Sequence, residues 1–245
     1  SPIMEDLRLT YGQMGLILGS WQIVYVAAAI PLGVVVDRLS VRKALGLGTF
    51  VVLLSMGTRG LSVDFLTLFI AVALFGIGGP IISTGAPKLV AIWFEGAERG
   101  VAAGIYTTGP IAGMAFAFAT ANSLVVPLMG TWRGISLVYG AVLLGVVGVW
   151  WLLARDIEPR AGGVTGEALE RPPVRAVLRD LLRLRNVQLV LLFAFGTFLL
   201  ADGLGSWIPA LLEERGMTLS QAGFWAAFAT AAGALGRLTI SSVAT

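Results

Sequence analysis

The sequence predicts an all-α integral membrane protein, and three observations lead to this fold class. Of the 245 residues, 57% are hydrophobic and 13% are charged, whereas a soluble domain usually has about 25% charged residues. The mean hydropathy is +0.87, so the chain has too few polar groups to cover a globular surface. Long uncharged stretches recur, while the alternating segments of about ten residues that form barrel strands are absent. A soluble enzyme or a soluble binding module is therefore excluded.

Seven uncharged stretches predict seven transmembrane helices, because a helix needs about 20 mostly apolar residues to cross the hydrocarbon core. Five stretches are long enough alone. The second also needs Arg59 at the far membrane face, and the sixth needs Asp202 inside the membrane. In order, the stretches are 9–36, 44–58, 65–87, 100–132, 134–154, 186–201 together with 203–212, and 216–236.

The distribution of Lys and Arg predicts the orientation of these helices. Thirteen of the 17 basic residues lie in one set of connections, and four lie in the other: Arg8, Arg59, Arg133 and Arg215. By the positive-inside rule, the richer set is cytoplasmic. We therefore expect a multi-pass protein of the cell (inner) membrane with residue 1 outside and residue 245 in the cytoplasm. The abrupt start and stop suggest a fragment of a longer chain.

The only long connection, 155–186, predicts a cytoplasmic linker. Pro172 and Pro173 give a helix-start signal. They are followed by apolar residues at helical spacing, with three arginines on the other face: Arg175, Arg179 and Arg183. This pattern is typical of a short basic amphipathic helix at a membrane surface, and a solvated run of charges is the alternative. The chain then divides into a helical half (1–154), the linker (155–186) and the start of a second half (187–245).

A six-residue pattern occurs twice. Thr10-Tyr-Gly-Gln13-Met-Gly15 recurs as Thr218-Leu-Ser-Gln221-Ala-Gly223. Each copy precedes an apolar span and fits a capping box, with Thr as N-cap and Gln at the third helical position. Both copies lie on the same predicted side, and the linker lies between them. Internal repeats of this kind are typical of transporters.

The end of the first span carries a charged motif, Gly33-Val-Val-Val-Asp37-Arg38-Leu-Ser-Val-Arg42-Lys43. It resembles the signature between helices 2 and 3 of the major facilitator superfamily. Trp93-Phe94 with Glu98-Arg99-Gly100, Trp132-Arg133 and the long central loop are similar to the same family. The resemblance implies helices 2 to 8 of a twelve-helix fold with two pseudo-repeated six-helix halves.

The sequence also resembles a narrower branch, the cyanate and 2-nitroimidazole permeases. This resemblance rests on three features: Arg59, Pro87-Lys88, and Ser206-Trp207-Ile208-Pro209 followed by Glu214-Arg215-Gly216-Met217. The usual Asn-Val-Leu stretch of that branch is replaced by Ser83-Thr84-Gly85-Ala86.

The family resemblance implies secondary active transport of a small solute by alternating access, as a symporter or antiporter. Arg59 and the branch favour a small organic or inorganic anion. The alternatives are proton-coupled export of drug-like compounds and, in a different class, a seven-helix receptor, against which the repeat and Asp37 argue. Without Cys or His, catalysis and metal sites that use them are excluded. We expect no enzymatic activity, cofactor, metal or nucleic acid partner, and a monomer in the lipid bilayer coupled to H⁺.

The resemblance implies a gating role for the rim cluster, which comprises Gly33, Asp37, Arg38, Arg42 and Lys43. A carboxylate beside cations can bridge neighbouring helix ends in one state and release them in another. The cations alone also fit a role in setting topology. A glycine at position 33 predicts close approach of the adjoining helix.

Five residues are candidates for contact with substrate or coupling proton: Asp202, Arg59, Trp207, Tyr106 and Tyr25. A charge inside the membrane costs about 2.5–3.5 kcal/mol on insertion scales, so Asp202 should face a cavity or a partner. An outer vestibule is the alternative, particularly if Gly203 and Gly205 break the helix. Arg59 suits an anion or interfacial snorkelling. The aromatic residues suit a polar path or ordinary hydrogen bonds between helices.

A possible hinge lies in the fourth span. Gly109-Pro110-Ile-Ala-Gly113 resembles the G-P-x-x-G part of a motif associated with antiporters, with Met114 where a second glycine is usual. Glycine beside proline predicts a helix that can bend.

Overall fold

The computed structural model describes residues 2–156, 174–229 and 232, and these residues form helices with no β-strand. The helices are α1 (Pro2–Asp6), α2 (Tyr11–Arg38), α3 (Val41–Gly60), α4 (Phe65–Trp93), α5 (Gly96–Thr120), α6 (Val126–Met129), α7 (Arg133–Leu153), α8 (Val174–Arg183) and α9 (Arg185–Glu214). A further helical stretch covers 219–229. The protein is thus an all-α membrane protein, as predicted.

The helices coincide with the predicted spans. Five segments are long and apolar enough to cross a membrane: Tyr11–Arg38, Val41–Gly60, Phe65–Trp93, Glu98–Met129 and Arg133–Leu153. They match the first five spans. The sixth prediction falls on α9, which has 30 residues. Of the seventh, 216–236, the structure describes a helical stretch at 219–229, and most of the remainder lies outside the described residues. Neither is among the five segments above, so the sixth and seventh spans stay predictions. Large apolar side chains such as Leu152 and Phe193 are 83% and 78% exposed, which suits contact with lipid rather than water.

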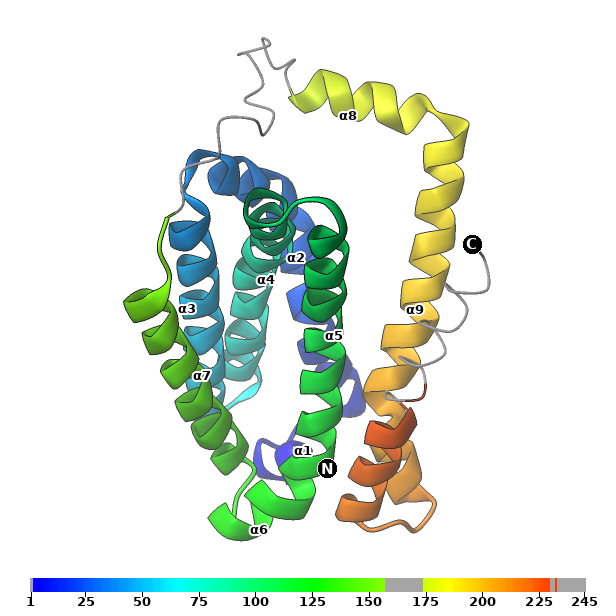
Figure 1. The fold of residues 1–245 in the computed structure, drawn as a ribbon. Coiled ribbons are helices and arrows are strands. Elements are labelled where there is room, and N and C mark those ends of the chain that lie inside the picture. Colours follow the sequence, from blue (N-terminus) through cyan, green and yellow to red (C-terminus); the bar gives the residue numbers. More distant parts are fainter. Residues whose placement is uncertain (1, 157–173, 230–231, 233–245) are drawn as a thin grey trace.

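Four helices form the core of the first half. α4 packs against α2 and α3, and α3 packs against α7 (Figure 1). Glycines make this packing close: a Cβ atom at Gly76 would lie 2.4 Å from the carbonyl oxygen of Trp21 on α2. A Cβ atom at Gly78 would lie 2.7 Å from the carbonyl oxygen of Gly48 on α3. Small residues at both crossings therefore let the helix backbones touch.

The close approach that we expected at Gly33 is not present in this structure. Among the described residues, no atom of a neighbouring helix lies within 4 Å of a Cβ position there. The α2–α4 crossing lies near Trp21, about 18 Å back along the helix at 1.5 Å per residue. At this end of α2 it is Val36, not Gly33, that packs against α4, beside Ile81.

Both predicted capping boxes are confirmed. The backbone N–H of Gln13 donates to Thr10 Oγ1 at 3.2 Å, and the Thr10 N–H donates to Gln13 Oε1 at 2.9 Å. The second copy repeats this pattern at 3.3 and 3.2 Å between Thr218 and Gln221. Each box satisfies N–H groups that a helix start leaves without a partner. The repeated pattern therefore has a structural cause at the start of two helices.

Several helices extend beyond their uncharged stretches. α4 continues through Pro87 and Lys88 to Trp93. α9 runs without interruption past Asp202 and its two neighbouring glycines, so the helix break considered above is not present. After α5 the chain makes a π-helical turn, Ala121–Val125. Pro127 explains this turn, because it lacks the N–H that would bond to the carbonyl of Ser123.

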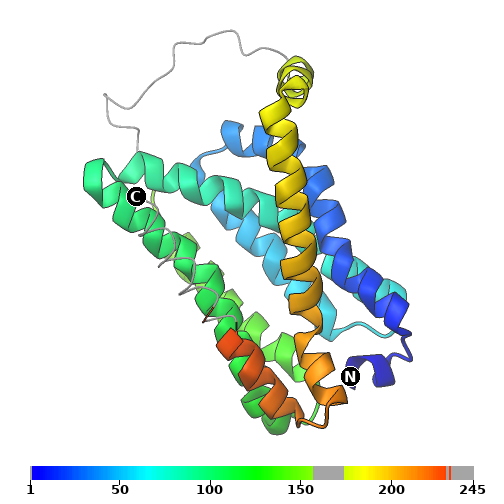
Figure 2. The ribbon, with the colours of Figure 1, turned by 90° about the vertical axis from the view of Figure 1, so that its right-hand side faces the viewer.

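The helix bundle has two distinct ends (Figures 1 and 2). We call the end with α1 and α6 the α1 end and the opposite end, with α8, the α8 end. In Figure 1 the start of α9 stands away from α2, α3, α4 and α7, whereas its last turns lie nearer to α1. α8 confirms a helix at the predicted amphipathic segment, and its Leu181 and Leu182 are 44% exposed. The rest of the linker, 157–173, lies outside the described residues.

Candidate functional site

A polar and aromatic group lies on the facing sides of α2 and α4. Tyr25, near the middle of α2, has its hydroxyl 2.7 Å from Ser83 Oγ on α4. The Trp21 ring meets the Tyr25 ring edge to face at 6.1 Å and meets Phe75 in the same way at 5.5 Å. A Cβ atom at Gly79 would lie 3.1 Å from the Tyr25 ring, so this glycine makes room for the ring. The structure thus pairs the candidate Tyr25 with a hydroxyl at mid-depth.

For the candidate Tyr106 on α5, no side-chain hydrogen bond is found among the described residues. Tyr106 is half-buried, and Thr107 donates to the carbonyl of Ala103 in its own helix at 2.9 Å. The helix continues through Pro110. In the part of the chain that the structure describes, no atom of a neighbouring helix lies within 4 Å of a Cβ position at Gly109 or Gly113. α5 therefore has open space around its possible hinge in this structure.

At the α8 end, residues of the rim cluster contact two different helices, α4 and α7. Lys88 on α4 pairs with Asp37, with 3.5 Å between Nζ and Oδ1, and also donates to the carbonyl of Val36 at 3.1 Å. Arg42 instead donates to the carbonyl of Trp151 on α7 at 2.8 Å. Trp150 returns a bond from its ring nitrogen to the carbonyl of Arg42 at 3.1 Å. Arg38 and Lys43 are exposed.

The sequence interpretation missed these partners of the rim cluster. The sequence places Lys88 in the branch motif and near a helix end, where snorkelling is expected. In the structure Lys88 ties α4 to the end of α2. The sequence signal that could have indicated this contact is a single lysine near the end of an apolar helix. Lys88, Arg42 and Trp150 also line a cavity of about 230 Å³. Together these contacts join the α2–α3 turn to the ends of α4 and α7.

Arg59 lies inside the first half. Its Nη2 donates to Ser55 Oγ at 3.2 Å, and Ser55 in turn donates to the carbonyl of Ala71 on α4 at 2.7 Å. Arg59 Nε is buried and has no hydrogen-bond partner among the described residues. The Arg59 guanidinium therefore lies at the α3–α4 interface, and its Nε–H is a donor for which the described residues supply no acceptor.

Two candidate residues, Asp202 and Trp207, lie on α9. The backbone of Asp202 is helical, but its side chain lies outside the described residues. The ring of Trp207 lies 6.2 Å from the ring of Tyr11 on α2. The Tyr11 hydroxyl donates to Glu214 Oε1 at 3.4 Å. Tyr11 lies in the repeated pattern and Glu214 in the branch motif, but neither motif predicts that the two residues meet.

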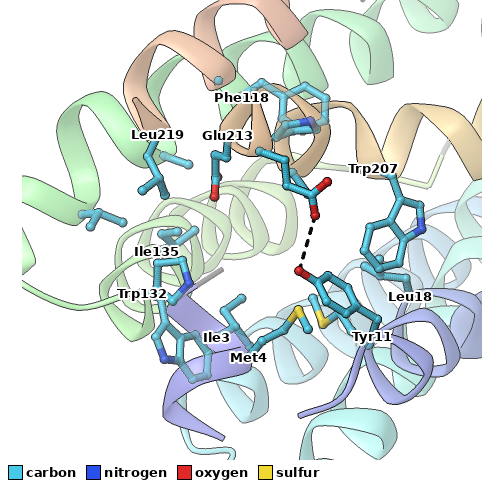
Figure 3. Close-up of a pocket in the computed structure, with 18 residues that line it drawn as sticks. Ile3, Met4, Tyr11, Leu18, Phe118, Trp132, Ile135, Trp207, Glu213 and Leu219 are labelled. Carbon is cyan, nitrogen blue, oxygen red and sulfur yellow. Dashed lines mark hydrogen bonds between the residues drawn. The ribbon is translucent and has the colours of Figure 1, made fainter. Parts of the chain in front are cut away.

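These contacts border a cavity of about 500 Å³ at the α1 end (Figure 3). Its walls come from α1, α2, the end of α5, α7 and α9, so it lies between the first half and α9. Aromatic and acidic side chains share the lining, among them Trp132, Trp207, Glu213 and Glu214.

Asp6 anchors α1 at this end of the bundle. Its carboxylate accepts hydrogen bonds from the Trp132 ring nitrogen at 2.9 Å and from Arg133. Arg133 also donates to the carbonyl of Ser62 at 2.9 Å. The bond from Trp132, followed by that from Arg133, lowers the pKa of Asp6 below its ordinary value of 3.8.

Replacing Asp6 with asparagine should therefore destabilise the protein in a pH-dependent way. A carboxyl with a lowered folded pKa stabilises the folded state above its unfolded value near pH 4, and this stabilisation is lost as the pH falls through the folded pKa. The melting temperature of Asp6→Asn should lie below that of the parent at about pH 7 and approach it in acid. Thermal unfolding of the full-length protein in detergent measures this, and a difference independent of pH would contradict it.

Comparison with known proteins adds to this geometry. A probable L-galactonate transporter of Escherichia coli (strain K12) is 28% identical over 249 residues, covering 96% of this chain and 54% of the relative. A probable sulfoacetate transporter of Cupriavidus necator is 27% identical over 250 residues, covering 96% and 56%. The chain therefore spans about half the length of these relatives. Neither relative tests the resemblance to the cyanate and 2-nitroimidazole permeases, which stays a prediction.

A solved structure has the same fold. It is the crystal structure of a bacterial homologue of the human lysosomal transporter Spinster, in an inward-facing and occupied conformation, with a TM-score of 0.72 and 20% identity. The match covers 97% of this chain and 54% of that one. The family model described as Major Facilitator Superfamily matches residues 1–244. This chain is thus a multi-pass membrane protein that belongs to the Major Facilitator Superfamily.

Proposed function

We propose that the full-length protein is a secondary active transporter that moves a small organic anion by alternating access. One observation carries this proposal: the superfamily match extends over residues 1–244, and relatives across the same region are named for L-galactonate and sulfoacetate. Both named compounds are small carboxylates. The relatives' substrates therefore support transport of a small anion over export of drug-like compounds. Only the Gly109-Pro110 motif favours export.

The contacts between the first half and α9 support alternating access. Tyr11 touches both Trp207 and Glu214 at the α1 end, while the start of α9 stands away from the core helices at the α8 end (Figure 1). We take the α1 end, where these contacts lie, as the closed end of the path. With the α8 end in the cytoplasm, as the basic residues predict, this state faces inward.

The division of the chain follows from the same proposal. Residues 1–154 form a first half that moves against a second half beginning at 187, and 155–186 form the cytoplasmic linker. α8 then lies at the inner membrane surface with its leucines toward lipid. We further propose that the protein acts as a monomer, because each substrate path lies between the two halves of one chain.

We propose that four residues line the substrate path: Tyr25, Ser83, Tyr106 and Trp207. Their hydroxyl and ring N–H groups can form hydrogen bonds to a hydroxylated anion. Arg59 keeps one free donor but faces α4, so we assign it to steadying the first half or to an anion that reaches this interface. Asp202 is proposed to carry the coupling proton. One proton moved with one monoanion transfers no net charge, which removes an opposition of about 2.3 kcal/mol per 100 mV of membrane potential.

Uptake by the full-length protein in proteoliposomes tests this function. Radiolabelled L-galactonate should accumulate at least tenfold over empty vesicles when the outside is acidic, and a protonophore should abolish the accumulation. Galactose, its neutral counterpart, should not accumulate. Equal uptake of both compounds, or uptake without dependence on the pH gradient, would contradict the proposal. Retained pH dependence in Asp202→Asn would remove Asp202 from proton coupling but leave anion transport standing.

A further inference from the structure

A short segment at the α1 end contacts three separate parts of the fold. This segment, Pro2–Tyr11, comprises α1, a turn and the first residue of α2. We propose that it is a strap that holds the outer side of the transporter closed by joining the first half to the end of α9. The proposal rests on the alternating access described above and assigns part of the outer closure to named residues.

The first attachment of the strap is Asp6. Its carboxylate receives the ring N–H of Trp132 and the guanidinium of Arg133, both at the start of α7. Arg133 also lies 4.5 Å from the centre of the Trp132 ring and donates to the carbonyl of Ser62. Trp132 is 7% exposed and Ser62 is 1% exposed. This attachment joins α1 to the α3–α4 turn and to α7 within the first half.

The second attachment of the strap is apolar. Leu9, in the turn after α1, is 8% exposed and belongs to a buried cluster with Ile17 of α2 and Leu68 and Val72 of α4. Ile3, Met4 and Leu7 pack against the same cluster. The strap is therefore fixed to the first half at both its polar and its apolar side, so that Tyr11 is held in position.

The third attachment reaches the other half. The Tyr11 hydroxyl donates to Glu214 Oε1 at 3.4 Å, and its ring lies 6.2 Å from Trp207 at a tilt of 40° (Figure 3). A Cβ atom at Gly15, one turn further along α2, would lie 3.9 Å from the Trp207 ring. The Tyr11 and Trp207 side chains thus meet at the edge of the 500 Å³ cavity.

The unequal strength of these attachments suits a device that must open in each cycle. Those within the first half are buried or charge-assisted, and such bonds are the stronger ones. The contact across to α9 is one long hydrogen bond and one ring contact, and Tyr11 is 62% exposed. Opening the outer side then breaks only this last attachment, while the strap stays on the first half. The strap therefore favours the state that is closed on the outer side but still allows the open state to form.

Distances between spin labels in the full-length protein test the strap. The 245 residues contain no Cys. In a full-length protein from which any other Cys has been removed, Leu61→Cys and Met217→Cys place one label on each half at the α1 end. In the parent, the short outer distance should dominate. Tyr11→Phe, which keeps the ring and removes the donor, should raise the long-distance population about fivefold, the effect of one hydrogen bond. Tyr11→Ala should raise it further.

Glu213→Gln is the matched control, because Glu213 lines the same cavity next to Glu214 and makes no hydrogen bond that we find among the described residues. It should leave the distance distribution unchanged. Unchanged distributions in both Tyr11 variants, or an equal shift in Glu213→Gln, would overturn the strap. Anion uptake by the parent protein distinguishes failure of the strap from failure of the proposed function. If the parent transports the anion but its Tyr11 variants show no shift in the distance distribution, the strap alone is refuted. A parent that takes up no anion refutes the proposed function.

Discussion

Replacing Gly76 with leucine is expected to prevent the first half from folding stably. A Cβ atom at this position would lie 2.4 Å from the Trp21 carbonyl oxygen and 2.9 Å from the Tyr25 backbone nitrogen. Both atoms belong to the backbone of α2, so neither can move without displacing the helix. Overpacking a core costs about 1–3 kcal/mol when side chains can adjust, and here the helices themselves must separate. We expect a loss above 3 kcal/mol, or about 10 °C in melting temperature.

The measurement is thermal unfolding and size-exclusion behaviour of the full-length variant in detergent. Gly57→Leu is the matched control, because Gly57 lies in α3 and no atom is found within 4 Å of its Cβ position. The two variants add the same apolar side chain and should insert equally well. Similar melting temperatures for both would show that the α2–α4 crossing is not as close as the structure has it.

Asp37→Asn is expected to lower the transport rate at least tenfold while insertion and folding remain normal. Asp37 pairs with Lys88 across the α2–α4 interface at 3.5 Å, and its side chain is 51% exposed. An exposed pair of this kind contributes about 0–1 kcal/mol to stability, so the fold should tolerate its loss. A gate needs contacts that form in one state and break in the other. Removing the charge should therefore change the populations of the two states rather than stability.

Uptake rates in proteoliposomes, normalised to inserted protein, measure this effect. Glu95→Gln is the control: it removes an acidic charge at the same end of the bundle, where Glu95 makes no side-chain capping bond to α5. It should transport at the parent rate. Equal rates for Asp37→Asn and the parent would exclude Asp37 from the gate and leave the rim cluster a role in topology only.

The fold class and the helix positions followed from the sequence because their causes are local. Hydropathy over about 20 residues selects a membrane helix, and a Thr with a Gln three positions later forms a capping box from neighbouring atoms alone. Thr10 with Gln13 and Thr218 with Gln221 show this. Where a helix end differed from prediction, as at Trp93, the helix continued past a single charged residue, Lys88, into further apolar residues. The family motif likewise lies in one short run of residues.

The contacts of the proposed strap and gate came only from the tertiary structure. Asp6 meets Trp132 across 126 positions, Tyr11 meets Glu214 across 203, and Lys88 meets Asp37 across 51. The family motif singles out Asp37, but no local pattern in the sequence identifies the partner of any of these side chains. The partner depends on which helix ends the packing brings together. In this chain that packing depends on close backbone crossings, such as that of Gly76 of α4 against Trp21 of α2, and each crossing is a property of two distant segments at once.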